Sequence, residues 1–144
     1  MRHFLQYHNP DRMGYSCQEL DGVTFWVVTR KMYILSRGDL VWLVGGEGKP
    51  RRFYLCEVFL SDQIERSKNP DFRFQIMGTK GVRFRPPVEL TLLPWFAELK
   101  RSVGNFSFGL SEISSKYAAL FDQSANQCSD SYQKMRALLW SEQQ

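Results

Sequence analysis

The sequence predicts an α+β fold: a small, curved, partly closed mixed β-barrel flanked by short helices. At least five short segments before Pro94 have the apolar patterns of strands, and after Pro94 the apolar residues follow the period of helices. The chain has 144 residues, the length of one ordinary domain. We expect one domain over residues 1–125, followed by a C-terminal helix or linker over residues 126–144.

The expected strands are short runs that alternate in polarity or are rich in β-branched and aromatic residues. They cover residues 3–8, 23–28, 40–44, 52–60, 72–77, 82–85 and 88–92. Gly45 to Pro50 is rich in turn-forming residues, so we expect the loop of a hairpin there. Pro86 and Pro87 are expected to end the strand before them, because proline cannot donate to a strand ladder.

Three helices are expected in the last third of the chain. Pro94 suits the first turn of a helix that runs to about Arg101. Ser111 is expected to cap a second helix, and Ser129 or Asp130 a third. Between the strands, a turn-rich loop and a short helical turn are expected at residues 9–14 and 31–36.

The composition excludes several classes of protein. No apolar run approaches the roughly 20 residues of a membrane-spanning helix, and the first residues lack the apolar segment of a secretory signal. Cys17, Cys56 and Cys128 have no CxxC spacing, which excludes a zinc ribbon and a full disulfide framework. We expect Cys56 to be inert core and Cys17 to be more exposed. A reducing cytoplasm is the expected location, with no membrane partner.

Signatures of catalysis are missing from the sequence. His3 and His8 have no cysteine or carboxylate at metal-ligand spacing, so we expect no metal site. The glycine-rich loop fails as a phosphate-binding P-loop, because Leu43 stands where the first glycine is needed and Pro50 follows the lysine. We therefore expect a protein without a cofactor that is not itself an enzyme, although it could serve as the specificity domain of a nuclease.

The basic residues point weakly toward a polyanion. Residues 1–110 contain 16 lysines and arginines against 11 aspartates and glutamates, within a net charge of +4 for the chain. Solvated surface is an equally good explanation of this pattern. The candidate phosphate contacts are Lys49, Arg51 and Arg52 at one hairpin, Lys80, Arg83 and Arg85 at another, and Arg30 with Lys31 and Arg37.

Aromatic residues are plentiful, with 11 Phe, 6 Tyr and 4 Trp. Trp95 and Trp140 are expected to pack in the core. Trp26 and Trp42 belong to the strand region that holds the basic excess, where an aromatic face can stack on an unpaired base. Simple packing is the alternative explanation for both.

Several segments, taken in order, resemble EVE domains. Residues 4–11 are similar to the opening strand of that family, and residues 35–42 to a Gly-Asp strand entry shared across the PUA-like superfamily of EVE, YTH and ASCH domains. Residues 55–59, 82–92 and 106–113 are similar to later parts of the domain. The likeness covers about residues 3–121. The sequence departs from the family at residues 8–10 and at residues 26–30.

The resemblance implies a PUA-like barrel that holds a modified, flipped base in an aromatic pocket. By position, Tyr7, His8 and Asn9 would contact the base edge. Trp26 would take the place of the pocket tryptophan, and Trp42 would close the other side. The remaining candidates for the pocket are Tyr15 and, as a late wall, Phe106 or Phe108.

The sequence thus predicts a non-catalytic nucleic-acid reader, with modified cytosine in DNA favoured over RNA. The resemblance implies a place in a modification-dependent restriction system, beside a fused or separate nuclease. One alternative is an RNA-binding domain or an ASCH-like ribonuclease that would use His8 with Tyr15. Another is a protein-interaction module whose aromatic residues are only core.

Overall fold

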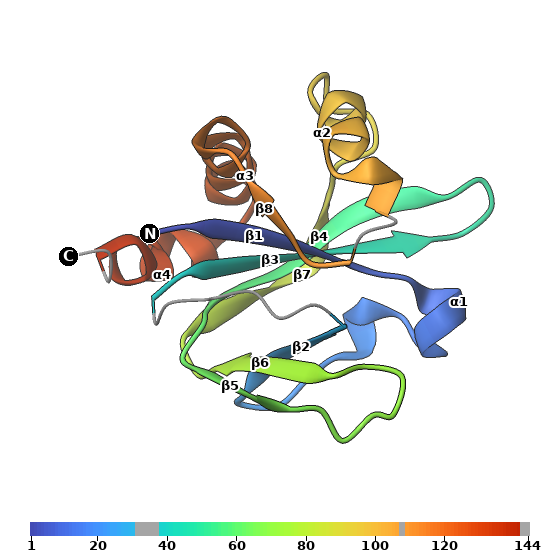
Figure 1. The fold of residues 1–144 in the computed structure, drawn as a ribbon. Coiled ribbons are helices and arrows are strands. Elements are labelled where there is room, and N and C mark those ends of the chain that lie inside the picture. The colour runs from blue at the N-terminus through green and yellow to red at the C-terminus, as the bar shows by residue number, and fades with distance from the viewer. Residues whose placement is uncertain (31–37, 107–108, 142–144) are drawn as a thin grey trace.

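A computed structural model describes residues 1–30, 38–106 and 109–141 of the chain. The mixed α+β class is confirmed: the described residues form eight strands in two sheets and four helices (Figure 1). No ladder of hydrogen bonds joins the two sheets within the described ranges, so a closed barrel is not found. The expected turn at residues 31–36 lies outside these ranges, as do Lys31, Arg37 and Phe108.

The larger sheet has the strand order β7-β4-β3-β1-β8. Its strands are β1 (His3–His8), β3 (Leu40–Glu47), β4 (Arg52–Leu60), β7 (Gly81–Glu89) and β8 (Ser111–Ile113). The pair β1 and β3 is parallel, and the other neighbours are antiparallel. The expected hairpin between β3 and β4 is confirmed.

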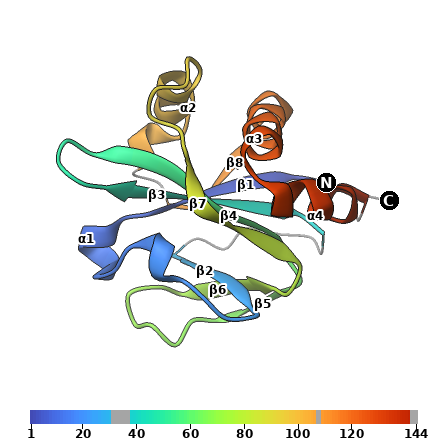
Figure 2. The same ribbon diagram turned by 180° about the vertical axis from the view of Figure 1, so that it is seen from behind.

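The smaller sheet lies against one face of the larger sheet (Figures 1 and 2). It has the order β2-β6-β5, with strands β2 (Phe25–Thr29), β6 (Phe74–Gly78) and β5 (Gln63–Arg66). Strand β5 is not expected from the sequence, because all four of its residues are exposed and no apolar alternation marks it. Strand β2 is an edge strand.

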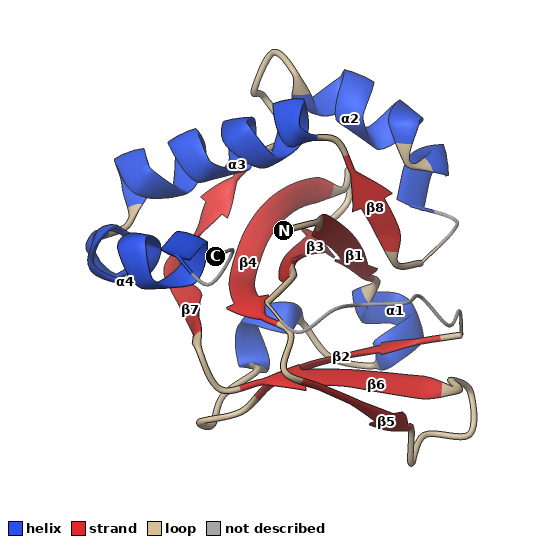
Figure 3. Cartoon of the chain, turned by 60° about the vertical axis from the view of Figure 1, so that its left-hand side comes forward, coloured by secondary structure: helices blue, strands red, loops and turns tan. Residues whose placement is uncertain are grey.

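Helices α2 (Phe96–Ser102), α3 (Ser115–Cys128) and α4 (Asp130–Ser141) cover the other face of the larger sheet (Figure 3). The short helix α1 (Pro10–Met13) lies at the end of β1, on the side of the smaller sheet. The start of α4 is as expected, and the Ser129 hydroxyl accepts a hydrogen bond from the Tyr132 amide. Tyr132 and Leu139 are fully buried, so α4 packs on the core.

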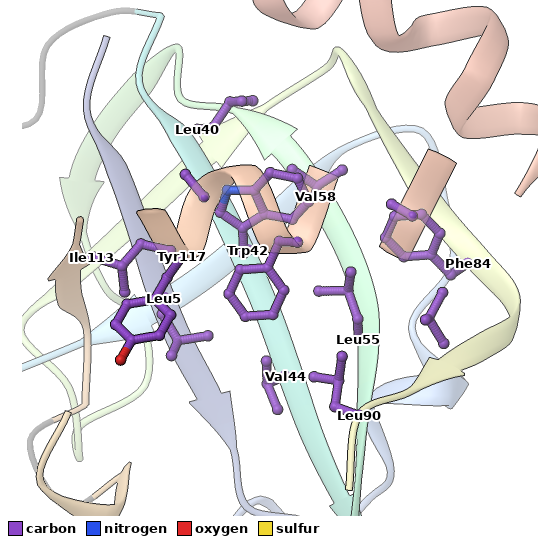
Figure 4. Packing of buried hydrophobic residues seen from close by; sticks show 14 of the residues in the cluster. Leu5, Leu40, Trp42, Val44, Leu55, Val58, Phe84, Leu90, Ile113 and Tyr117 are labelled. Atoms are coloured by element: carbon purple, nitrogen blue, oxygen red, sulfur yellow. The ribbon is translucent and has the colours of Figure 1, made fainter. Parts of the chain in front are cut away.

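Side chains alternate along β3 and therefore enter two separate cores. Val41 and Leu43 face the smaller sheet, whereas Trp42 and Val44 face the helices. Figure 4 shows Trp42 at the centre of the helix-side core, between side chains of the neighbouring strands. The expectation that Trp42 closes a base pocket is therefore wrong, because its ring is fully buried on the opposite face of the sheet.

Two glycines extend β3 beyond the expected strand. Gly45 and Gly46 were expected in a loop, but they pair with Tyr54 and Phe53 in the β3–β4 ladder. A Cβ on Gly45 would clash with the Cys17 sulfur, and one on Gly46 with the Tyr7 hydroxyl. Glycine is needed here because other chain segments pack directly on the strand backbone.

Strand β7 continues through the two prolines that were expected to end it. Its ladder to β4 runs through Arg83 at one end and resumes at Val88, and the residues between these two are not paired. Pro86 and Pro87 fall in this irregular stretch, where the missing amide donors are not needed.

The expectation that Ser111 caps a helix is wrong. Residues 111–113 form β8, which pairs antiparallel with the first three residues of β1. The cap position of helix α3 is Ser114, three residues after the expected cap, and the helix begins at Ser115. Serines stand at both possible cap positions, Ser111 and Ser114. Because residues 111–113 pair with β1, the helix begins after the second of them. No helix among the described residues is long and apolar enough to cross a membrane.

We expect Trp42→Ala to lower the free energy of unfolding by about 3–5 kcal/mol, because it leaves a large cavity in a close-packed core. Urea unfolding followed by circular dichroism measures this change. Leu92→Ala is the matched control: Leu92 is 81% exposed, so its removal should change stability by no more than about 0.5 kcal/mol. Equal effects of the two substitutions would contradict the assignment of Trp42 to the core.

Candidate functional site

A cavity of about 530 Å³ lies where the end of β1, helix α1, strand β2 and the turn at residues 104–106 meet. Its volume falls within the range of roughly 300–1,000 Å³ that is usual for small-molecule sites. The residues that line it are Gln6, Tyr7, His8, Asn9, Arg12, Met13, Tyr15, Leu20, Trp26, Val27, Val28, Thr29, Arg30, Leu43, Phe72, Asn105, Phe106 and Gly109.

The cavity lies beside the last residues of β1. Among the described residues, β8 pairs with β1 only at His3, Phe4 and Leu5. The chain then turns away through α1. The Asn9 side-chain oxygen accepts a hydrogen bond from the Asp11 amide, and the helix ends at Gly14 with φ of 84°.

One wall of the cavity is built on unusual backbone. Asn105 and Phe106 have φ of 55° and 67°, the left-handed region that side chains rarely adopt. The Phe106 ring stacks on the Tyr7 ring, with centroids 4.7 Å apart and planes 11° apart. Strained backbone of this kind persists where the surroundings hold it, and it gathers at functional sites.

His8 lies in the cavity wall as a neutral side chain. Its Nε2 is 2.8 Å from the main-chain oxygen of Tyr15, so Nε2 carries the hydrogen and Nδ1 is an acceptor. Burial lowers the pKa of His8, and the bond to Tyr15 and the charge of Glu47 only partly oppose this. The ring is therefore uncharged at neutral pH. The bond reaches the Tyr15 main chain and not the hydroxyl that the ribonuclease alternative would use.

A row of paired residues, three of them polar, crosses the larger sheet. Gln6, Leu43, Glu57 and Arg83 are consecutive partners across β1, β3, β4 and β7. Arg83 Nε donates to Glu57 at 3.2 Å, while the other carboxylate oxygen is buried and has no hydrogen-bond partner among the described residues. Burial raises the pKa of Glu57 to about 7, and the Arg83 charge only partly offsets this.

Most of the basic residues predicted to hold phosphates have partners inside the chain. Arg83 donates to the main-chain oxygens of Gly22 and Thr24, and Arg85 to that of Leu20. Arg51 forms an ion pair with Asp11 at 2.6 Å, and Arg52 forms one with Glu89. Lys49 and Lys80 are exposed at two turns. Of the seven candidates that the structure describes, Arg30 is the one that lines the cavity.

A second arginine joins Arg30 at the cavity. The guanidinium carbons of Arg12 and Arg30 each lie 5.8 Å from the centre of the Phe72 ring. Arg30 Nε also donates to the Asp71 main-chain oxygen at 3.0 Å. Arg12 and Phe72 were not predicted, because they lie far apart in the sequence. The one feature of the sequence that could have indicated Arg12 as a cavity residue is its position just after the first predicted strand.

The structure brings together six of the seven residues predicted for the base pocket. Tyr7, His8, Asn9, Tyr15, Trp26 and Phe106 all line the cavity, and Trp42 does not. Trp26 is half-buried on edge strand β2. Within the described ranges, no group of three or more His, Cys, Asp or Glu residues could hold a metal ion.

Of the two cysteines near the cavity, Cys56 is buried as expected and Cys17 differs from expectation. Cys17 was expected to be exposed, but it is 4% exposed and joined to Cys56 in a disulfide. Cys17 follows directly after the Tyr15–Ser16 segment that holds His8, so this bond fixes the cavity wall to β4.

Comparison of the chain with protein-family models finds no match, and no curated protein sequence matches it.

We expect Glu57→Gln to change how stability depends on pH. The pKa of Glu57 is about 7 in the folded chain against an ordinary 4.5, so the folded state binds more protons between these values. The free energy of unfolding of the wild type, minus that of the variant, should therefore fall by about 3 kcal/mol as pH rises through this window. Urea unfolding of both proteins at several pH values measures it.

The two histidines titrate alike in both proteins, so their contributions cancel in the difference. A difference that stays flat, or rises, through the window would show that Glu57 is not a buried, proton-binding carboxyl.

Proposed function

We propose that this chain is a non-catalytic reader of nucleic acid that holds one flipped base in the cavity, with modified cytosine in DNA as its preferred ligand. The observation that carries the proposal is the cavity itself, which combines aromatic walls, polar groups along one strand end and two guanidinium groups. The resemblance to EVE domains of the PUA-like superfamily, with their partly closed barrel, supports the proposal as an analogy of fold.

The aromatic side chains supply the faces on which a base can stack. Trp26 lies on β2, and the stacked pair Tyr7 and Phe106, on β1 and on the turn at residues 104–106, lines the same cavity. A flat heterocycle between these elements would be held by its faces, which works only for a base taken out of its helix. His8 and Asn9 would then contact its edge.

The two arginines supply charge beside the base. Within the described residues, neither Arg12 nor Arg30 forms an ion pair with a carboxylate, and both are exposed. A flipped nucleotide carries a phosphate on each side of its sugar, and guanidinium groups bind such oxygens in pairs. Arg12 and Arg30 therefore take the role that was first assigned to the two hairpins.

The remaining parts of the proposal concern where the reader acts. We place it in the cytoplasm with its nucleic acid, without a membrane partner. A fused or separate nuclease would cut where the reader binds, as in modification-dependent restriction systems. RNA in place of DNA is an outcome that the binding tests below distinguish.

We expect Trp26→Ala to weaken binding by about tenfold to a hundredfold, because stacking on one aromatic ring contributes roughly 1–3 kcal/mol per base. Fluorescence anisotropy measures it, with a labelled duplex that carries 5-methylcytosine opposite an abasic site and with the matching RNA. Trp42→Phe is the control, because Trp42 lies on the opposite face of the sheet. Unchanged affinity for both nucleic acids in Trp26→Ala would overturn the base pocket.

We expect Arg12→Ala and Arg30→Ala each to lower the slope of log affinity against log salt by about 1, because each removes one phosphate contact. The same anisotropy assay at several salt concentrations measures the slope. Arg66→Ala is the matched control, since Arg66 is exposed on β5 and does not line the cavity. Equal slopes for all three variants would remove the arginines from the interface.

A further inference from the structure

The arginines of the two hairpins are not arranged to follow a long stretch of nucleic-acid backbone. Arg83 and Arg85 donate to main-chain oxygens of the segment before β2. Arg51 and Arg52 each form an ion pair with a carboxylate. A protein that tracks a backbone presents many cations to successive phosphates. These four arginines instead have partners inside the chain, so the arginines of the cavity have to be considered by themselves.

Arg12 and Arg30 come together at the cavity from distant parts of the chain. Arg12 belongs to α1 and Arg30 follows the last residue of β2. Both residues are exposed and line the cavity, so a ligand there can reach them. Their guanidinium carbons each lie 5.8 Å from the centre of the Phe72 ring, which lines the same cavity. Two like charges beside one ring repel each other, and an anion bound by both relieves this repulsion.

The charge of these two arginines matches one phosphate monoester. A phosphate in the middle of a nucleic-acid strand carries one negative charge. A phosphate monoester carries a charge of about −1.5 to −2 at neutral pH, because its second pKa is about 6. A guanidinium group also binds phosphate oxygens through two parallel hydrogen bonds. The pair Arg12 and Arg30 is therefore better neutralised by a terminal phosphate than by a phosphate within a chain.

The size of the cavity also favours more than a base. Its volume of about 530 Å³ lies in the range of roughly 300–1,000 Å³ that encloses drug-sized ligands. A base without its sugar and phosphate is smaller than such a ligand. Trp26 and the two arginines line this one cavity, so a single molecule with a flat ring at one end and a phosphate at the other can contact both.

We propose that the cavity binds a free nucleoside monophosphate, with its base on the aromatic wall that includes Trp26 and its phosphate between Arg12 and Arg30. This inference rests on the proposed function, from which it takes the stacking of the base. The unit that the chain recognises is then one nucleotide, and flanking nucleotides are not required. A free nucleotide and a flipped nucleotide offer the site the same base, sugar and phosphate groups, and the experiment below separates these two sources.

The test compares ligands that differ by the phosphate. Isothermal titration calorimetry at neutral pH and low salt measures binding of the 5′-monophosphate of 5-methyldeoxycytidine, of the same nucleoside without phosphate, and of inorganic phosphate. We expect the monophosphate to bind about tenfold or more tightly than either of the other two, because it alone makes both the stacking and the charged contacts.

Variants connect each part of the nucleotide to its residues. Arg12→Ala and Arg30→Ala should each reduce the affinity ratio of monophosphate to nucleoside, by about threefold or more. Trp26→Ala should weaken both ligands and leave the ratio unchanged, because stacking is common to them. Arg66→Ala is the matched control, since Arg66 is exposed on β5 and does not line the cavity. Circular dichroism confirms that each variant is folded, and if one arginine variant is not, the other decides.

Competition with the labelled duplex separates the inference from the proposed function. The free monophosphate should displace the duplex, because both use the same cavity. Duplex binding that depends on Trp26 but resists displacement by up to about 10 mM monophosphate overturns the inference and leaves the reader in place. A nucleoside that binds as tightly as its monophosphate, or a ratio that persists in both arginine variants, also overturns the inference. Monophosphate bound through the arginines, with no binding of duplex or RNA, supports the inference and overturns the reader.

Discussion

The candidate site depends on the way the chain leaves the larger sheet after β1. Asn9 caps helix α1 directly after the last residue of β1, and this helix turns the chain out of the sheet. Among the described residues, β8 pairs with β1 only at His3, Phe4 and Leu5. The cavity lies at this end of β1, and its walls also come from β2, the turn at residues 104–106 and the side chains of Leu43 and Phe72.

Several charged residues of the sequence have their partners within the folded chain. Glu57 is almost fully buried, and a carboxylate there needs a cation beside it. Arg83 fills that need and also holds the segment before β2 through main-chain oxygens. The basic residues of β7 are thus used to position β2, whose Trp26 lines the cavity. The two arginines that line the cavity are Arg12 and Arg30, and both lie beside the Phe72 ring.

Burial decides the hydrogen-bonding character of the site as well. His8 is kept neutral by desolvation, and a carbonyl holds its one hydrogen. The Asn9 side-chain oxygen accepts the hydrogen bond that caps α1. The group that Asn9 offers to the cavity is therefore its amide NH₂, which is a donor. Gln6 was not predicted from the sequence, and its side-chain oxygen is buried and has no hydrogen-bond partner among the described residues.

The sequence by itself determined the α+β class, the first strand, the central hairpin and most of the aromatic residues around the cavity, because local period and residue type carry that information. It could not place β5, β8 or the extension of β3 through Gly45, where long-range pairing outweighs local preference. Tertiary structure alone decided that Trp42 and Trp26 lie on opposite sides of the larger sheet, and which arginines have partners. The physical reason is that side-chain direction and charge pairing depend on segments that are distant in the chain.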